Sequence, residues 1–444
     1  MNNNSMYDLS NAGGVEYNET ENYSYDSWFS TPGLSDLDEY RIIRYHMNQE
    51  NLLLHWKYAY LEITGQLYKK AGQMVKYTAD DKISFIHNSV PHLFTNAKFT
   101  VGNKTVETVN LPGYASSLMN NVLYPRSLQK NAGLQFNWVA DTTKDANSEN
   151  KGWEIRRKRL LVSPSSPGAF KLRMPLSNMF GFCQNMVPLR GYPIEVELVR
   201  GMDATTLFLG GETVPGKLKI TAMRLNIPVV TPNNKIQLET LKGLTNPKSY
   251  LYSFRAKNCM FAPIPKSVTT FQLSVTSDSM PERPQQLFVG LQRNTQTPPD
   301  NQKFNHSLFS HEDVLEMVVK MNNCQIPEKP IPANWKNADS GFFYEAMLHQ
   351  RANFLQFPGT YSDNTFLNPE NFEKMYTIFC FDVTKQQNLL SARTVNCELH
   401  TTFRTPTNPG IKMYVAWYFD RTLELFSDGK SINIKSQTTS YSHS

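Results

Sequence analysis

Hydrophobic and polar residues alternate with a period of two along most of the first half of the chain. In residues 61–67 aliphatic side chains alternate with polar ones, and residues 194–198 and 217–220 repeat that pattern. Strict alternation is typical of a β-strand with one buried face. Residues 97–107 are predicted to form a hairpin, because Gly102-Asn103 supplies a turn between two alternating runs.

The second half of the chain has the same pattern. Residues 271–275 and 395–403 alternate cleanly, whereas residues 413–419 are apolar on both faces. A strand that is apolar on both faces is central in its sheet or lies at a buried interface. Asp428-Gly429 then supplies a closing turn.

Helical patterns are few and short. Tyr114, Leu118 and Val122 are spaced four apart and would share one helix face, and residues 342–349 have room for two helical turns. Two short helices are too few to connect the strands of a parallel sheet. The predicted fold class is therefore all-β, with short helices in the loops of sandwiches or barrels.

The two halves end alike, in two long strands separated by a Gly-led turn. A Pro-containing bridge at residues 228–234 lies just past the midpoint of the chain. We interpret this as a weak internal repeat of one sandwich of jelly-roll size. The predicted organisation is a flexible N-terminal arm over 1–45, a first jelly roll over 46–228, a linker over 229–247, a second jelly roll over 248–432 and a C-terminal tail over 433–444. The arm is polar and acidic, a composition that becomes ordered against a partner.

Composition supports a soluble globular protein. The 444 residues carry 45 Lys and Arg against 39 Asp and Glu, a formal net charge of +6, and 40% of them are hydrophobic. The apolar fraction is too high for a disordered chain, and no apolar run approaches the ~20 residues that span a bilayer. The N-terminal residues do not resemble a secretory signal. The mild positive charge permits contact with nucleic acid without requiring it.

Candidate chemistry is sparse. The five cysteines (Cys183, Cys259, Cys324, Cys380 and Cys397) are scattered, which argues against a disulfide framework and a zinc site. The nine histidines include no H-x-H pair of the kind that a cupin-type metal site uses, and no nucleophile, zinc-protease or nucleotide motif occurs. We therefore expect neither enzymatic activity nor a cofactor.

The strongest charge run is Arg156-Arg157-Lys158-Arg159. It is a candidate phosphate contact or nuclear-import patch. The alternative is a solvated edge strand or loop, and the run is too short to decide between them.

Aromatic residues gather in segments that read as loops. They are candidate subunit contacts because oligomer interfaces are enriched in aromatic side chains, and the alternative is that they cover their own sheet. The candidates are Trp335, Phe354, Phe357 and Tyr361, together with Trp417 of the doubly apolar strand.

Several segments resemble a known family. Residues 171–183 (KLRMPLSNMFGFC) and residues 192–200 (YPIEVELVR) are similar to a pattern of the double jelly-roll major capsid proteins of Polinton/Maverick elements and adintoviruses. Residues 284–291, 376–384 and the last long strand resemble further landmarks of that family, so the likeness spans roughly residues 55–430.

The resemblance implies a capsid protein that performs no chemistry. Three chains would close head-to-tail into a homotrimer with six sandwiches, a pseudo-hexameric capsomer that tiles an icosahedral virion shell. Implied partners are neighbouring capsomers, a penton protein with a single jelly roll and minor capsid proteins, with assembly in the nucleus or the cytoplasm. The N-terminal arm would reach beneath neighbouring capsomers or contact an internal component.

Two other functions remain open at this stage. The first is a two-domain carbohydrate- or receptor-binding β-sandwich protein, although a secreted lectin normally has a signal peptide or paired cysteines. The second is a cupin-like metalloenzyme, which the histidine pattern disfavours.

Overall fold

The structure is a computed structural model. It describes residues 20–31, 39, 41–48, 53–71, 73–163, 165–184, 189–190, 192–211, 214–232, 249–275, 283–294, 302–322, 324–355, 365–384, 396–426 and 432–436. Every strand pair among these residues is antiparallel.

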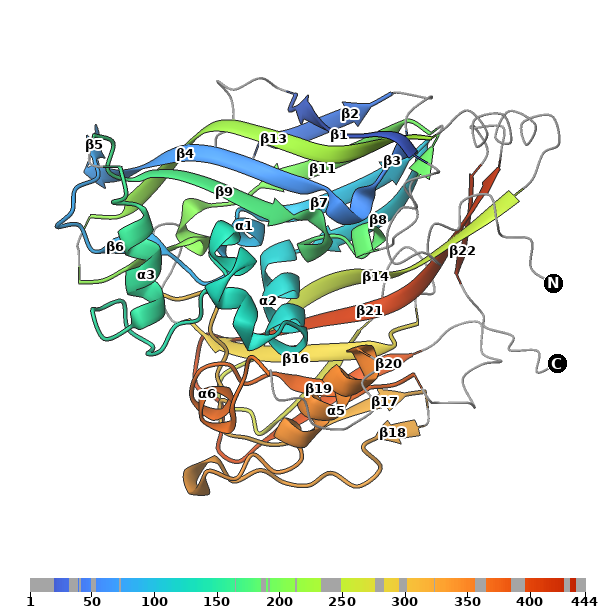
Figure 1. The fold of residues 1–444 in the computed structure, drawn as a ribbon. Coiled ribbons are helices and arrows are strands. Elements are labelled where there is room, and N and C mark those ends of the chain that lie inside the picture. The colour runs from blue at the N-terminus through green and yellow to red at the C-terminus, as the bar shows by residue number, and fades with distance from the viewer. Residues whose placement is uncertain are drawn as a thin grey trace.

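The first half of the chain forms one sandwich, in the upper part of Figure 1. Its larger sheet contains β1 (Thr20–Phe29), β3 (Leu53–Leu54), β4 (Tyr60–Ala71), β5 (Gln73–Lys76), β9 (Ala169–Pro175), β10 (Leu189–Arg190) and β13 (Gly216–Pro232). The smaller sheet has the order β2 (Ile42–Met47), β11 (Ile194–Arg200), β7 (Phe94–Val101) and β8 (Lys104–Asn110). A short ladder joins β6 (Ile83–Phe85) to β12 (Leu207–Leu209). Alternate side chains of β2 and β11 are buried, as the period-two pattern predicts.

The second half forms another sandwich below the first (Figure 1). One sheet has the order β14 (Ser249–Pro263), β21 (Ile411–Phe426), β16 (Gln286–Arg293) and β19 (Phe379–Asp382), with β22 (Ile432–Ser436) also paired to β21. The other has the order β15 (Thr270–Ser274), β20 (Cys397–Phe403), β17 (Val314–Met321) and β18 (Cys324–Ile326). The doubly apolar run 413–419 lies in β21, which is central in its sheet and buried along that run, so this prediction is confirmed.

Short helices fill the ends and the space between the sandwiches. They are α1 (Ser89–His92), α2 (Pro112–Leu123), α3 (Lys151–Arg159), α5 (Phe343–Leu355) and α6 (Pro369–Lys374). The predicted helices at 114–122 and 342–349 correspond to α2 and α5. All twelve residues of α2 are buried, because the helix packs between the two sandwiches (Figure 1). Apolar side chains of both sandwiches and of α2 form one continuous core.

The prediction of a flexible arm over residues 1–45 is wrong for part of that range. Residues 20–29 form β1, which pairs with residues 224–232 of β13, and residues 42–47 form β2 at the edge of the smaller sheet. The alternation in Tyr23-Ser24-Tyr25-Asp26-Ser27 is a strand pattern that the polar composition of the segment concealed.

The other two predicted boundaries also fall near strands. The linker 229–247 begins inside β13, which continues to Pro232, and residues 233–247 lie outside the described residues. The C-terminal tail 433–444 includes most of β22, whose backbone pairs with β21. Pro228 and Pro232 both lie within β13, so the prolines did not mark the boundary of the first sandwich.

Candidate functional site

The place where the two sandwiches meet contains a buried charged cluster. Glu107 of β8 is fully buried, and its carboxylate accepts hydrogen bonds from the backbone N–H groups of Gly181, Phe182 and Lys257, each at 2.9 Å. Lys257 of β14 belongs to the other sandwich, and its Nζ donates to the carbonyl oxygens of Ser177 and Asn178, each at 2.9 Å. This cluster therefore ties strands of both sandwiches to the segment 177–182.

Burial perturbs both charges of the cluster. It raises the pKa of Glu107, although the three N–H donors and Lys257 oppose that shift. Burial also lowers the pKa of Lys257 to about 8 against the attraction of Glu107. Each charge is held in a dry environment by fixed hydrogen bonds, so the cluster specifies one arrangement of the two sandwiches.

The segment in the cluster is the Phe-Gly-Phe-Cys sequence on which the family resemblance rests. Phe182 stacks on Tyr252 of β14 with ring centroids 4.9 Å apart and contacts the Phe99 ring of β7 at 4.5 Å. A Cβ atom at Gly181 would lie 1.7 Å from the carbonyl oxygen of Arg255, so only glycine permits this approach of the two backbones. The motif is thus the surface by which the first sandwich packs on the second.

Helix α2 makes a second connection between the sandwiches. The Tyr114 ring stacks on the Tyr414 ring of β21 at 4.0 Å, and its hydroxyl lies 2.7 Å from Nδ1 of His306. The Ser117 hydroxyl of the same helix lies 3.0 Å from Nε2 of the buried His92, whose ring packs edge-on against the Tyr114 ring at 5.0 Å. Both histidines therefore pack against α2.

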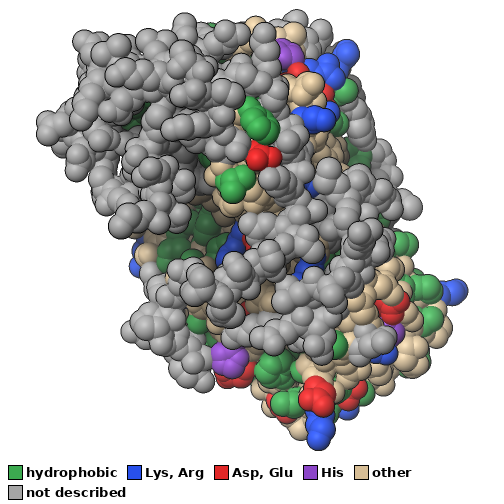
Figure 2. All heavy atoms as spheres, turned by 90° about the vertical axis from the view of Figure 1, so that its right-hand side faces the viewer, with side chains coloured by type: hydrophobic (Ala, Val, Ile, Leu, Met, Phe, Trp, Pro, Cys, Tyr) green, Lys and Arg blue, Asp and Glu red, His purple; other side chains and the backbone are tan. Residues whose placement is uncertain are grey.

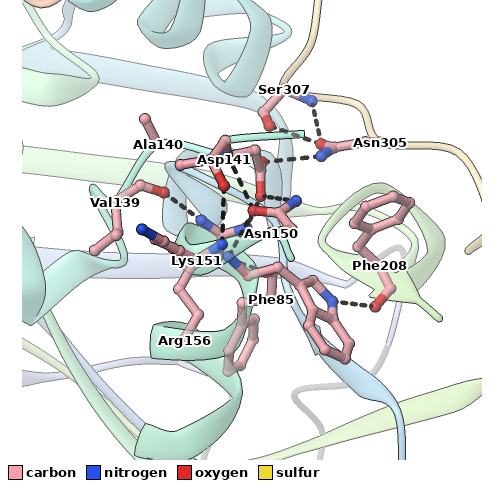
Figure 3. A network of polar contacts seen from close by, with 12 residues as sticks. Phe85, Val139, Ala140, Asp141, Asn150, Lys151, Arg156, Phe208, Asn305 and Ser307 are labelled. Carbon is pink, nitrogen blue, oxygen red and sulfur yellow. Dashed lines mark hydrogen bonds and ion pairs between the residues drawn. The ribbon is translucent and has the colours of Figure 1, made fainter. Parts of the chain in front are cut away.

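The basic run 156–159 lies on α3 and not on a strand or loop, which corrects the structural alternative stated above. Arg156 is only 1% exposed and points into the protein (Figure 3). Its Nη2 lies 2.5 Å from Oδ1 of Asp141, its Nε donates to the Phe85 carbonyl at 2.8 Å, and its Nη1 donates to the Val139 carbonyl.

Asp141 extends this network into the second sandwich. Its Oδ2 accepts a hydrogen bond from the Asn305 side chain at 3.0 Å, and its backbone N–H donates to the Tyr376 hydroxyl at 2.9 Å (Figure 3 shows Asn305). Asn150 donates to Oδ1 of Asp141 and also caps α3 by accepting from the Trp153 N–H. Arg156 therefore positions a loop that holds both sandwiches and is not available to nucleic acid.

The other three basic side chains of the run differ in their contacts and in their exposure to solvent. Arg157 pairs with Glu154 at 3.0 Å and donates to the Ala79 carbonyl at 2.8 Å, whereas the Lys158 side chain is 71% exposed. Arg159 is half-buried, and burial lowers its pKa. The run presents mainly Lys158 to solvent and is not a continuous tetrabasic patch.

We expect the substitution Arg156→Ala to destabilise the fold by about 3–5 kcal/mol, because it leaves the Asp141 carboxylate buried without its charged partner. Urea unfolding followed by tryptophan fluorescence measures this change. The matched control is Lys158→Ala on the same helix, which should leave the unfolding midpoint unchanged. Equal midpoints for the two variants would contradict the structural role of Arg156.

The aromatic candidates lie against their own sandwich where the structure describes them. Trp417 is 3% exposed inside β21, so its prediction as a subunit contact is wrong. Trp335 is half-buried, stacks on His311 at 4.5 Å and donates from Nε1 to the Val314 carbonyl. Phe354 is half-buried between Tyr418 and the Arg255 guanidinium. Phe357 and Tyr361 lie outside the described residues.

Sequence reasoning missed the exposed aromatics of the first sandwich. Tyr23, Tyr25 and Phe29 of β1 are 44%, 53% and 63% exposed, and Tyr58 is 47% exposed. At the end of the molecule shown in Figure 2, the described Lys and Arg side chains are interspersed with Asp and Glu and form no single patch. The exposed aromatics of β1 were not predicted, because residues 1–45 were interpreted as a flexible arm.

The described residues provide no metal site, membrane-spanning helix or disulfide. Among the described residues, no group of three His, Cys, Asp or Glu side chains is placed to hold a metal ion. No described helix is long and apolar enough to cross a membrane. Cys183, Cys259, Cys380 and Cys397 are buried, Cys324 is half-buried, and all five are free thiols.

Comparisons with known proteins agree with this architecture. A chain in the cryo-EM structure of the Sputnik virophage superimposes with a TM-score of 0.63 at 11% identity, over 97% of this chain and 91% of that chain. The mavirus major capsid protein gives 0.53 at 13% identity over 96% and 93%, and the PBCV-1 virus capsid gives 0.51 at 8% identity over 93% and 96%. At these identities the likeness concerns the fold.

The sequence comparisons are more specific about the family. No curated protein matches the chain by sequence. The sequence profile of the double jelly roll-like domain matches residues 119–422, a stretch that begins in α2 and includes most of the second sandwich. The predicted pair of tandem jelly rolls is confirmed, and because the profile covers more than half of the chain, the protein belongs to the double jelly roll-like domain family.

Proposed function

We propose that this chain is the major capsid protein of an icosahedral virus or virus-like element. The observation that carries the proposal is the junction around Glu107 and Lys257, whose buried hydrogen bonds join the two sandwiches of one chain. A shell tile needs its two sandwiches in a fixed arrangement, since relative motion between them would disturb its contacts with neighbouring tiles. The likeness to the folds of a Sputnik virophage chain, the mavirus major capsid protein and the PBCV-1 virus capsid supports the same role.

Three copies of such a unit form a closed ring of six sandwiches. A head-to-tail contact closes when the rotation between copies returns to the start after three steps. The resulting homotrimer has a nearly sixfold outline and packs with neighbouring trimers in a flat layer. Its place is the virion capsid, and its partners are other capsomers, a penton protein with a single jelly roll and minor capsid proteins.

The family motif favours the Polinton/Maverick and adintovirus type, with assembly in the nucleus or the cytoplasm of the host. The motif residues 176–183 lie at the junction, so their resemblance to that group concerns the part that fixes the tile geometry. A carbohydrate- or receptor-binding module is not favoured, since the similar folds come from the Sputnik virophage, the mavirus major capsid protein and the PBCV-1 virus capsid.

Size-exclusion chromatography with light scattering tests the trimer. The purified full-length chain should have a mass near three times 50.9 kDa, and the mass should hold on tenfold dilution because obligate contacts bury about 2,000 Å² or more. A stable mass of one chain at every concentration would contradict the proposal.

A further inference from the structure

The outer face of the larger sheet of the first sandwich contains a cleft of about 430 Å³. It is lined by Tyr25, Lys57, Tyr58, Ala59, Tyr60, Gln135, Arg173 and Pro175. These residues come from β1, from the turn before β4, from β4 itself, from β9 and from the loop after α2. Segments far apart in the chain thus converge on one surface feature outside the junction.

The cleft has aromatic walls that are open to solvent. The rings of Tyr25 and Tyr60 lie 6.0 Å apart, and the ring of Tyr23 packs edge-on against Tyr25 at 6.1 Å. Tyr25 and Tyr58 are each about half exposed. Exposed tyrosines of this kind are typical of contact surfaces, because they give a large rigid contact area with a polar tip.

The cleft and its rim are also positively charged. Arg173 and Lys171 of β9 share one carboxylate, Glu62, at 2.7 Å and 3.0 Å. Among the described residues Lys57 forms no ion pair, and its Nζ lies 6.0 Å from the centre of the Tyr58 ring. Three cations against one carboxylate leave a net positive site, so its ligand should carry negative charge next to aromatic groups.

The chain itself contains a segment with that chemistry. Residues 1–19 carry Asp8, Glu16 and Glu19, two tyrosines and no Lys or Arg. The excess of acidic residues extends over residues 1–45, which have eight Asp and Glu against two Arg. Residues 46–228 have the opposite excess, with 22 Lys and Arg against 13 Asp and Glu. Opposite charges are therefore concentrated in the N-terminal segment and in the sandwich that bears the cleft.

We propose that this cleft binds residues 1–19 of a neighbouring copy of the chain in the assembled shell. The inference rests on the proposed function. Residues 1–19 directly precede β1, which begins at Thr20 and contributes Tyr25 to the cleft. At about 3.3 Å per residue, a 19-residue segment reaches about 60 Å, enough to extend to an adjacent subunit. The acidic side chains would face Lys57 and Arg173, and the tyrosines would pack on Tyr25 and Tyr58.

Cysteine cross-linking between full-length chains tests this contact. One chain carries Val15→Cys, which keeps all three carboxylates, and the other carries Gln135→Cys at the exposed rim of the cleft. Co-assembled under mild oxidation, they should give a reducible product of about twice 50.9 kDa. The product should fall at least fivefold when the cleft chain also carries Lys57→Glu, and should be unchanged with Lys158→Glu on α3. Val15→Cys with native Gln135 measures any background from Cys324.

Three results would count against the inference. Shells that form without the cross-link would overturn it and leave the capsid function standing. A single chain that carries both Val15→Cys and Gln135→Cys provides a further test. If it forms only a disulfide within itself, the segment occupies its own cleft and the inference is overturned. Failure to form shells, seen by electron microscopy, would contradict the proposed function and with it this inference.

Discussion

Replacement of Glu107 by alanine is expected to separate the two sandwiches and destabilise the chain by about 5 kcal/mol. The substitution leaves three buried N–H groups, those of Gly181, Phe182 and Lys257, without their acceptor. It also leaves the buried Lys257 ammonium without the opposite charge that favours its protonated form. Urea unfolding followed by tryptophan fluorescence should show an earlier and broader transition, because the halves no longer unfold together.

Two further variants separate charge from shape in this experiment. Glu107→Gln retains an acceptor oxygen and the side-chain size, so it should lose less stability than Glu107→Ala. Glu370→Ala removes an exposed carboxylate that pairs with Lys374 on α6, and the unfolding midpoint should not change. An unchanged midpoint for Glu107→Ala would show that the junction is not held by this cluster.

Acidification below pH 6.5 is expected to destabilise the chain steeply. Burial lowers the pKa of His87 and His306 to about 4 and lowers that of His92 well below its usual value; Arg156 and Lys412 add to the effect at His87 and His306. The unfolded chain takes up protons at these groups near pH 6.5, whereas the folded chain does not, so stability falls as the pH falls from 6.5 toward 4. His87 and His306 each contribute about 1.4 kcal/mol per pH unit, or about 3 kcal/mol together at pH 5.5, and His92 acts in the same direction.

The histidine contribution is isolated by substitution. His306→Gln keeps a polar partner for the Tyr114 hydroxyl and does not titrate, so it should reduce the slope of stability against pH by about 1 kcal/mol per pH unit between pH 6.5 and 5. His349→Gln on the exposed side of α5 should leave the slope unchanged. The pKa of Glu107 is raised and acts in the opposite direction, so the comparison between variants is more informative than the wild-type curve. Equal slopes for the two variants would contradict the explanation.

Period-two alternation was sufficient to predict the all-β class and several individual elements. The hairpin at 97–107 is β7 and β8, and the doubly apolar run 413–419 lies in the central strand β21. These predictions succeed because burial on one or both faces of a sheet leaves a direct trace in the local sequence. Helix α2 was predicted from the four-residue spacing of Tyr114, Leu118 and Val122, whereas its complete burial between the two sandwiches was not predicted.

The candidate site was predicted less well, because its residues act through distant partners. Arg156 reads as part of a basic run, and only its contacts with Asp141 and Phe85 identify it as a buried residue. Glu107 is one acidic residue in an ordinary hairpin, and its partners lie 74 to 150 positions away. Strand β1 was missed since an edge strand exposes one face and one edge, which lowers its hydrophobicity.

Electron microscopy with image averaging of the purified, full-length protein shows whether two jelly rolls joined in one chain produce a shell tile when three copies close. We expect averages with threefold symmetry and a nearly hexagonal outline, together with flat arrays or closed shells at higher concentration. Averages that show only isolated two-lobed particles at every concentration would contradict this expectation.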